Sequence, residues 1–190
     1  NYYKTGSGND TINVESWKST IYSGAGNDLI TARYSTINAG AGNDTIIGLR
    51  KYSFDGEDTF IQYSANDGND VITDIDYFGG TIDLLNNASV TGYSISGSDH
   101  ILKICSGSIT FKGLDTQNYS YYDNLVDISV KRGSNYYRYL NGVEFNDISY
   151  VSGHYPNNET TNGTSGNDYF SFNWEPNATI KADAGDDYIK

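Results

Sequence analysis

Short segments in which apolar and polar residues alternate run along the whole chain, separated by groups of Gly, Ser, Asn and Asp. Alternation with a period of two is typical of β-strands, and these polar groups favour tight turns. The segments 19–22 and 35–38 each carry one apolar residue at an inward position. Four later segments alternate more fully: 81–85, 92–95, 100–104 and 108–112. The pattern predicts an all-β fold of many short strands.

A five-residue motif, Gly-x-Gly-Asn-Asp, interrupts this pattern at residues 6–10, 24–28 and 40–44, and looser copies follow. The seven copies end at Asp10, Asp28, Asp44, Asp58, Asp70, Asp168 and Asp187. Two residues beyond these aspartates stand large apolar residues: Ile12, Ile30, Ile46, Phe60, Ile72, Phe170 and Ile189. Repeats at a fixed short period indicate a solenoid, in which each copy supplies one turn.

The spacing of the motif suits a turn of two short strands. The first five aspartates are 18, 16, 14 and 12 residues apart, and the last two are 19 apart. A Gly-rich turn reaches positive φ and points successive backbone carbonyls toward one place, where an aspartate completes an all-oxygen site for a hard cation. One loop offers too few oxygens, but two stacked loops offer enough. The alternative is an ordinary Gly/Asn/Asp turn between strands, which would bind nothing.

The copies resemble the nonapeptide Gly-Gly-x-Gly-x-Asp-x-U-x of the RTX (repeats-in-toxin, hemolysin-type calcium-binding) family. The resemblance covers residues 5–75 and 163–190, although the first glycine of the nonapeptide is replaced, for example by Thr5, Ser23 and Ala39. It implies a parallel β-roll that binds Ca²⁺ through the seven aspartates. It also implies backbone carbonyl ligands around Gly6, Gly8, Gly24, Gly26, Gly40, Gly42, Gly166 and Gly185.

The other edge of the roll, around residues 15–18 and 33–34, lacks the motif, so we expect a calcium column on one edge only. The shorter steps of 14 and 12 residues leave the positions of the loops of Asp58 and Asp70 open. Either loop can continue this column, lie on the opposite edge, or have no stacked partner.

The charge of the chain agrees with cation binding. The net charge is −12, and 12 of the 24 acidic residues lie inside the seven motifs. Such a field repels phosphate backbones and anionic lipid headgroups, which argues against nucleic-acid and membrane partners. Without a bound cation the stacked carboxylates would repel one another, so we expect folding to require the metal.

We expect three parts: a calcium β-roll at residues 1–80, a region of capping strands at 81–156, and a linker with two further repeat rows at 157–190. Residues 125–130 and 136–140 predict a hairpin through a turn at 133–135. Such strands would cover the open end of the solenoid and prevent edge-to-edge association. Residues 150–166 are predicted to be a linker.

Signals for catalysis are weak. His100 and His154 stand apart from any metal-binding or nucleophile motif, and the single cysteine, Cys105, is expected to be a small buried strand residue. We therefore expect no enzyme. Tyrosines cluster at residues 2–3, 119–122 and 136–139, where they either favour strands, stack on sugar rings or bury in a protein interface.

Two functions compete. The first is a secreted calcium-loaded β-roll with a structural or adhesive role at the cell surface. The second is a carbohydrate-binding or accessory module of an extracellular polysaccharide-active enzyme. Residues 164–190 repeat the pattern of 5–31, and we expect these last rows to stack on the first rows of another subunit in a head-to-tail filament. A slice of a longer covalent array is the other explanation of this repeat.

Overall fold

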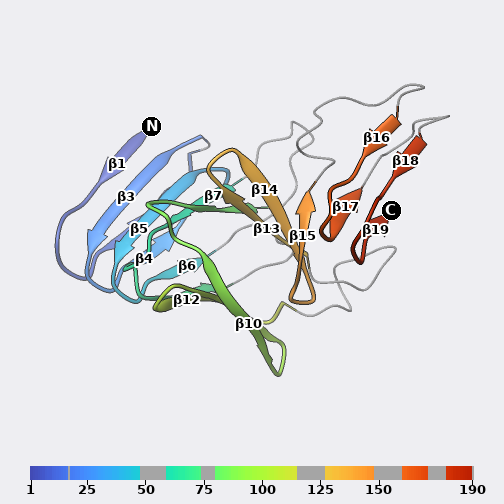
Figure 1. Cartoon of the computed structure of the whole chain (residues 1–190). Coiled ribbons are helices and arrows are strands. Elements are labelled where there is room, and N and C mark those ends of the chain that lie inside the picture. Colours follow the sequence, from blue (N-terminus) through green and yellow to red (C-terminus); the bar gives the residue numbers. More distant parts are fainter. Residues whose placement is uncertain are drawn as a thin grey trace.

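The computed structural model describes residues 1–16, 18–47, 59–73, 80–114, 127–147, 160–170 and 179–189. These residues form strands and turns, as the alternating pattern predicts, and they contain no helix long and apolar enough to cross a membrane. The strands make up two large sheets and one small sheet. Figure 1 shows the first rows of the roll at one end of the molecule and β16 to β19 at the other.

The larger sheet has ten strands in the order β1-β3-β5-β7-β9-β13-β14-β15-β17-β19. The bounds of the first five are β1 (Tyr2–Lys4), β3 (Thr20–Ala25), β5 (Thr36–Ala41), β7 (Thr59–Tyr63) and β9 (Gly80–Leu84). The other five are β13 (Asp127–Arg132), β14 (Asn135–Leu140), β15 (Val143–Asp147), β17 (Asp168–Phe170) and β19 (Tyr188–Ile189).

The second sheet has seven strands in the order β10-β11-β12-β8-β6-β4-β2. Their bounds are β10 (Val90–Ser96), β11 (Asp99–Ile104), β12 (Gly107–Phe111), β8 (Asn69–Thr73), β6 (Thr45–Ile47), β4 (Leu29–Thr31) and β2 (Thr11–Asn13). A separate two-stranded sheet pairs β16 (Thr160–Asn162) with β18 (Thr179–Lys181).

The chain alternates between the two large sheets, so that successive strands of each sheet are parallel neighbours. Each passage from the larger to the second sheet forms one row of a β-roll. Row 1 is β1 to β2, row 2 is β3 to β4, row 3 is β5 to β6 and row 4 is β7 to β8. Rows 5 and 6 are β16 to β17 and β18 to β19, and they run from the two-stranded sheet to the larger sheet. This architecture is the predicted parallel β-roll.

Columns of isoleucine fill the space between the two sheets. Ile12, Ile30, Ile46 and Ile72 are in register in the second sheet and are buried. Ile21, Ile37, Ile61 and Ile82 form the facing column in the larger sheet and are at most 1% exposed. The short strands β2, β4 and β6 each bury one residue, whereas β3, β5 and β7 each bury two or three, at alternate positions.

Antiparallel strands continue both sheets beyond row 4. The meander of β10, β11 and β12 pairs with β8, and β13, β14 and β15 continue from β9. These strands agree with the predicted segments between 81 and 140. Beyond β15, the strands β17 and β19 complete the larger sheet (Figure 1).

Phe60 is not in the isoleucine column of the second sheet, because β7 lies in the larger sheet and buries Ile61 instead. Two local predictions are wrong. Cys105 lies in the turn after β11, half-buried at a φ of 51°, and not inside a strand. Part of the predicted linker forms β16. His154 lies outside the described residues, and His100 is buried with its ring bonded to the Tyr93 hydroxyl.

Candidate metal centre

The aspartates that end the motif loops lie above one another along one edge of the roll. The backbone N–H of each donates to Oδ1 of the aspartate in the next row: Asp10 to Asp28 at 2.8 Å, Asp28 to Asp44 at 2.7 Å and Asp44 to Asp70 at 3.0 Å. Each accepting carboxylate therefore leans back toward the preceding row. It lies in the gap between two stacked loops.

The asparagines that precede these aspartates form a second ladder in the opposite direction. Oδ1 of Asn9 accepts from the N–H of Asn27, Oδ1 of Asn27 from Asn43, and Oδ1 of Asn43 from Asn69, all at 2.8–2.9 Å. Two opposed ladders fix the spacing and register of the loops through hydrogen bonds alone. The role of the asparagines was not predicted from the sequence, although the Asn-Asp pair that the first three copies share was its visible signal.

The glycines of the motif allow the loops to stack closely. A Cβ placed on Gly24 would lie 1.9 Å from the carbonyl oxygen of Gly6, and one on Gly42 would lie 1.9 Å from that of Gly26. The carbonyl oxygens of each row thus point into the gap toward the next row. Gly8, Gly24, Gly26 and Gly40 also have positive φ, which favours glycine independently. The gaps are therefore lined by backbone oxygens.

Burial makes the charged form of these aspartate carboxylates unfavourable in the folded chain when no cation is bound. Oδ2 of Asp28 and Oδ2 of Asp44 are buried and have no hydrogen-bond partner. Burial raises the pKa of Asp44 to about 6, and the charges of Asp28 and Asp67 act in the same direction. Burial also raises the pKa of Asp70 to about 8, again with like charges nearby. None of the ion pairs found in the described part of the chain involves these aspartates.

The donor set fits calcium. Each gap combines one buried carboxylate with backbone carbonyl oxygens, and calcium accepts six to eight such oxygen ligands in irregular geometry. Within the described ranges, no group of three or more His, Cys, Asp or Glu side chains could hold a metal. The loops would therefore hold calcium mainly through backbone oxygens. The aspartate of the later row supplies the negative charge.

Row 4 differs from the spacing predicted by sequence. Asp44 bonds directly to Asp70, 26 residues further on, and Gly42 bridges to Gly68. The loop of Asp70 is thus the next member of the column. Asp58 lies outside the described residues, immediately before β7, which belongs to the larger sheet. The chain segment that ends at Asp58 returns from β6 to β7, so it does not connect the two strands of a row.

Row 4 also closes the column. Tyr63 stands where rows 1 to 3 have the small residues Thr5, Ser23 and Ala39, and it is fully buried. Its hydroxyl donates to the carbonyl of Gly68, and burial raises the pKa of Tyr63, so the proton stays on the hydroxyl. The carbonyl oxygen of Gly68, on the side of row 4 that faces the capping strands, is therefore already hydrogen-bonded to Tyr63.

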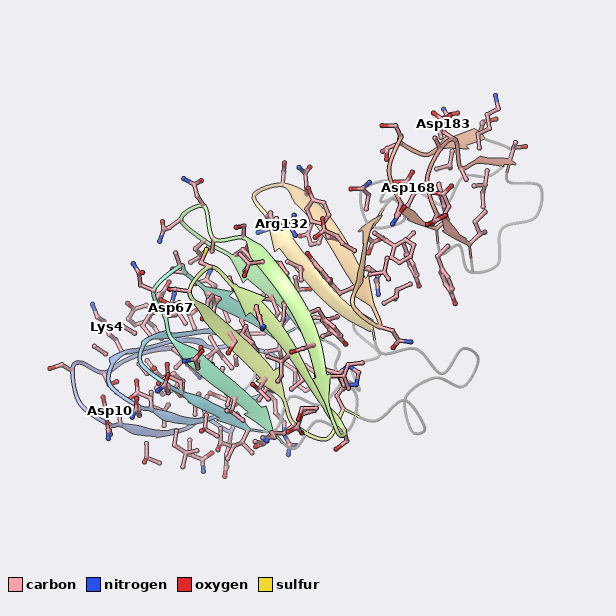
Figure 2. All side chains as sticks on the ribbon, turned by 60° about the horizontal axis from the view of Figure 1, so that its bottom comes forward. Lys4, Asp10, Asp67, Arg132, Asp168 and Asp183 are labelled. Atoms are coloured by element: carbon pink, nitrogen blue, oxygen red, sulfur yellow. The ribbon has the colours of Figure 1, made fainter. Side chains whose placement is uncertain are left out.

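Rows 5 and 6 repeat both ladders at the other end of the molecule (Figure 2). The N–H of Asp168 donates to Oδ1 of Asp187 at 3.0 Å, and the N–H of Asp186 donates to Oδ1 of Asn167 at 2.8 Å. A Cβ on Gly185 would lie 2.5 Å from the carbonyl of Gly166. Rows 5 and 6 therefore enclose a fourth gap with the same two ladders, although its carboxylate, that of Asp187, is only half-buried.

The carboxylate of Asp168 has a different environment from those of Asp28 and Asp44. It accepts from the Thr164 hydroxyl at 2.9 Å and from the Asn146 amide at 3.0 Å, and it is completely buried. The hydrogen bond from Asn146 therefore connects the loop of row 5 to β15. Of the sequence-predicted aspartates, the structure thus places Asp28, Asp44, Asp70 and Asp187 in gaps between rows, and it places Asp10 on the outer side of row 1.

The raised pKa values predict how the calcium-free chain responds to pH. The folded pKa values of about 6 for Asp44 and about 8 for Asp70 exceed the ordinary value of 3.8. Between these values the folded state binds more protons than the unfolded state, so stability falls as pH rises. In chelator, the melting temperature is expected to decrease from pH 5 to pH 8. Differential scanning calorimetry tests this, and a melting temperature that rises over this window would contradict it.

The stacked loops with their buried, unpaired carboxylates define a calcium-binding β-roll. A family model of the RTX calcium-binding nonapeptide repeat matches residues 4–33 and 35–50, in four copies. Residues 4–50 therefore carry RTX repeats, which bind calcium ions, and the predicted resemblance is confirmed there. Rows 4 to 6 lie beyond this match and share its ladders. Among curated proteins, none matches the chain.

Proposed function

We propose that this chain is an extracellular structural module whose roll is completed by calcium, with an adhesive or scaffolding role at a cell surface. The observation that carries the proposal is the pair of buried Oδ2 atoms of Asp28 and Asp44, which have no partner inside gaps lined by glycine carbonyls. A buried carboxylate without a partner is strongly unfavourable, and a hard cation removes that cost. The described residues suggest no catalytic role.

The calcium concentration that these sites would need supports an extracellular location. Each gap has one carboxylate, and sites with few charged ligands bind calcium weakly, at about 10⁻⁴–10⁻³ M in extracellular modules. Sites of this affinity stay empty where calcium is scarce and fill where it is abundant. A chain that folds only on calcium loading would thus become rigid after export.

A calcium titration tests the proposal. Isothermal titration of the chain is expected to show uptake at four gaps, between the loops of Asp10 and Asp28, Asp28 and Asp44, Asp44 and Asp70, and Asp168 and Asp187. Magnesium is expected to bind poorly, because it demands compact octahedral geometry and retains its water. Absence of calcium uptake, or equal uptake of magnesium, would reject the proposed function.

Self-association belongs to the same proposal. A roll that repeats its row pattern at both ends supports head-to-tail contact between copies, and a filament or array suits an adhesive surface protein. Sedimentation with and without calcium measures this association.

A glycan-binding role has one specific observation in its favour. Tyr2 is 66% exposed, and its ring lies 5.7 Å from that of Tyr22. Exposed tyrosine rings can stack on sugars. Glycan-array binding that is lost in Tyr2→Ala, by a chain that stays monomeric in calcium, would favour this second function.

A further inference from the structure

The capping strand β12 continues the column of glycines that runs through rows 1 to 4. A Cβ on Gly107, the first residue of β12, would lie 2.0 Å from the carbonyl oxygen of Gly68 in row 4. The loop glycines of rows 2 to 4 approach the row before them equally closely, at 1.8–2.2 Å. Row 4 and β12 therefore enclose one further gap, between Gly68 and Gly107, which we call the closed gap.

The residues after Gly107 differ from those of a calcium loop. Rows 1 to 4 read Gly-Asn-Asp at this place, whereas β12 reads Gly-Ser-Ile. Ile109 pairs in register with Asp70, so it occupies the position of the next aspartate in the column. Its side chain is completely buried. The closed gap therefore receives no carboxylate from β12.

The hydroxyl of Tyr63 enters the closed gap instead. It donates to the carbonyl of Gly68, and a Cβ on Gly107 would collide with it. The residues at this position in rows 1 and 2, Thr5 and Ser23, donate to main-chain carbonyls one row further on, at 2.6 and 2.7 Å. The longer side chain of Tyr63 thus brings a hydrogen-bond donor to a glycine carbonyl of the loop.

A second donor binds the same carbonyl. Between rows 1 to 4, the N–H of each later asparagine donates to Oδ1 of the asparagine in the preceding row. In β12 the equivalent N–H, that of Ser108, donates to the carbonyl of Gly68 at 3.0 Å, and the Ser108 hydroxyl donates to Oδ1 of Asn69. A carbonyl oxygen has two lone pairs, so Ser108 and Tyr63 together use both.

We propose that the Tyr63 hydroxyl takes the place of calcium in the closed gap, so that row 4 remains stacked on β12 whether or not calcium is bound. Two neutral donors satisfy the Gly68 carbonyl there, and Ile109 adds no buried charge that would need a cation. Row 4 and the strands β10 to β12 thus form a calcium-independent anchor on which rows 1 to 3 stack as their sites fill. This inference rests on the proposed calcium-binding function.

The anchor also has a core that rows 1 to 3 lack. Leu102, Ile104, Ile109 and Phe111 of β11 and β12 are fully buried, as is Tyr63. By contrast, β2, β4 and β6 each bury one isoleucine. Burial of apolar side chains does not depend on a cation, so the anchor keeps this stabilisation in chelator.

Residue-resolved hydrogen exchange of the wild-type chain tests the anchor. The N–H groups of Leu29 and Thr45 donate to the preceding row beside calcium gaps, whereas those of Ser108 and Lys112 donate to row 4 from β12. On transfer from millimolar calcium to chelator, exchange at Leu29 and Thr45 is expected to accelerate by at least about tenfold, and exchange at Ser108 and Lys112 by less than about threefold. Equal acceleration at all four amides would overturn the anchor.

Tyr63→Phe removes only the hydroxyl and keeps the ring in the core. The Gly68 carbonyl then loses one of its two donors, so exchange at Ser108 is expected to accelerate about tenfold, by the same factor in calcium and in chelator. Tyr3→Phe, which removes a hydroxyl from β1, is the matched control and is expected to leave Ser108 unchanged. Unchanged exchange at Ser108 in Tyr63→Phe would overturn the role of the hydroxyl.

Two double variants test whether Tyr63 and Ile109 keep calcium out. Tyr63→Ser with Ile109→Asp restores the serine and the aspartate of row 2, and it is expected to bind one calcium ion more than the wild-type chain. Tyr63→Ser with Ile109→Asn leaves the same space without the charge, and it is expected to bind no additional ion. Isothermal titration counts the ions, and circular dichroism in calcium reports folding.

The results separate this inference from the proposed function. No calcium uptake by the wild-type chain, or no acceleration of exchange at Leu29 and Thr45 in chelator, would overturn both. Uptake by the wild-type chain with no additional ion in the folded aspartate variant would overturn the role of Tyr63 alone. If that variant does not fold in calcium, the exchange at Ser108 in Tyr63→Phe decides the question.

Discussion

Removal of calcium is expected to destabilise the roll strongly and to lower the melting temperature of its unfolding transition. Each site stabilises the folded chain by about 2.7 kcal/mol once calcium reaches 100 times its Kd, which is about 10 mM for a Kd of about 10⁻⁴ M, so four such sites contribute on the order of 10 kcal/mol. That sum is comparable to the whole stability of an ordinary domain, about 5–15 kcal/mol. The roll has little to replace it, because β2, β4 and β6 each bury a single isoleucine in a thin core. Far-UV circular dichroism and calorimetry in chelator and in calcium measure the effect.

Two aspartate variants separate calcium binding from general destabilisation. Asp44→Asn keeps an oxygen that can accept from the N–H of Asp28 but removes the buried charge. It is expected to lose part of the stabilisation by calcium and to be more stable than wild type in chelator. Asp99→Asn changes a surface carboxylate paired with Lys112 and is expected to leave the calcium response intact. A wild-type chain whose melting temperature is equal in calcium and chelator would contradict the account.

Gly42→Ala is expected to be among the most damaging single substitutions of the loops. Its Cβ would lie 1.9 Å from the Gly26 carbonyl, so rows 2 and 3 would have to separate, at a cost of about 3 kcal/mol or more from overpacking. Gly97→Ala is the matched control. Gly97 also has positive φ, at 64°, but its Cβ position is open, so only backbone strain of about 1–2 kcal/mol is expected. Equal effects in chemical denaturation would mean that close row stacking does not limit stability.

Sequence predicts the parts of this fold that depend on local pattern. The alternation around Ile21 and Ile37 identifies strands, and the Gly-x-Gly-Asn-Asp motif identifies the loops between the two sheets. Both signals lie within a few residues of the feature that they predict. The capping strands β10 to β12 were predictable for the same reason.

Long-range pairing was not predictable in this way. Spacing left open whether the loops of Asp58 and Asp70 join the column, whereas in the structure the backbone N–H of Asp44 donates to Asp70, 26 residues away. A Gly-Asp-rich segment looks the same on either edge of a roll, because only the neighbouring row decides which edge it joins. The attachment of β17 to β15 is likewise a pairing between distant segments. The asparagine ladder was visible as a repeated residue, but its direction depends on the stacked geometry.

Anomalous scattering from crystals grown in calcium tests the central claim most directly. The account predicts peaks in the four gaps between stacked loops, each next to the carboxylate of the later row, at Asp28, Asp44, Asp70 and Asp187. Each peak should have oxygen ligands at about 2.3–2.6 Å. Gaps without peaks, or calcium bound only by surface carboxylates outside the loops, would contradict it.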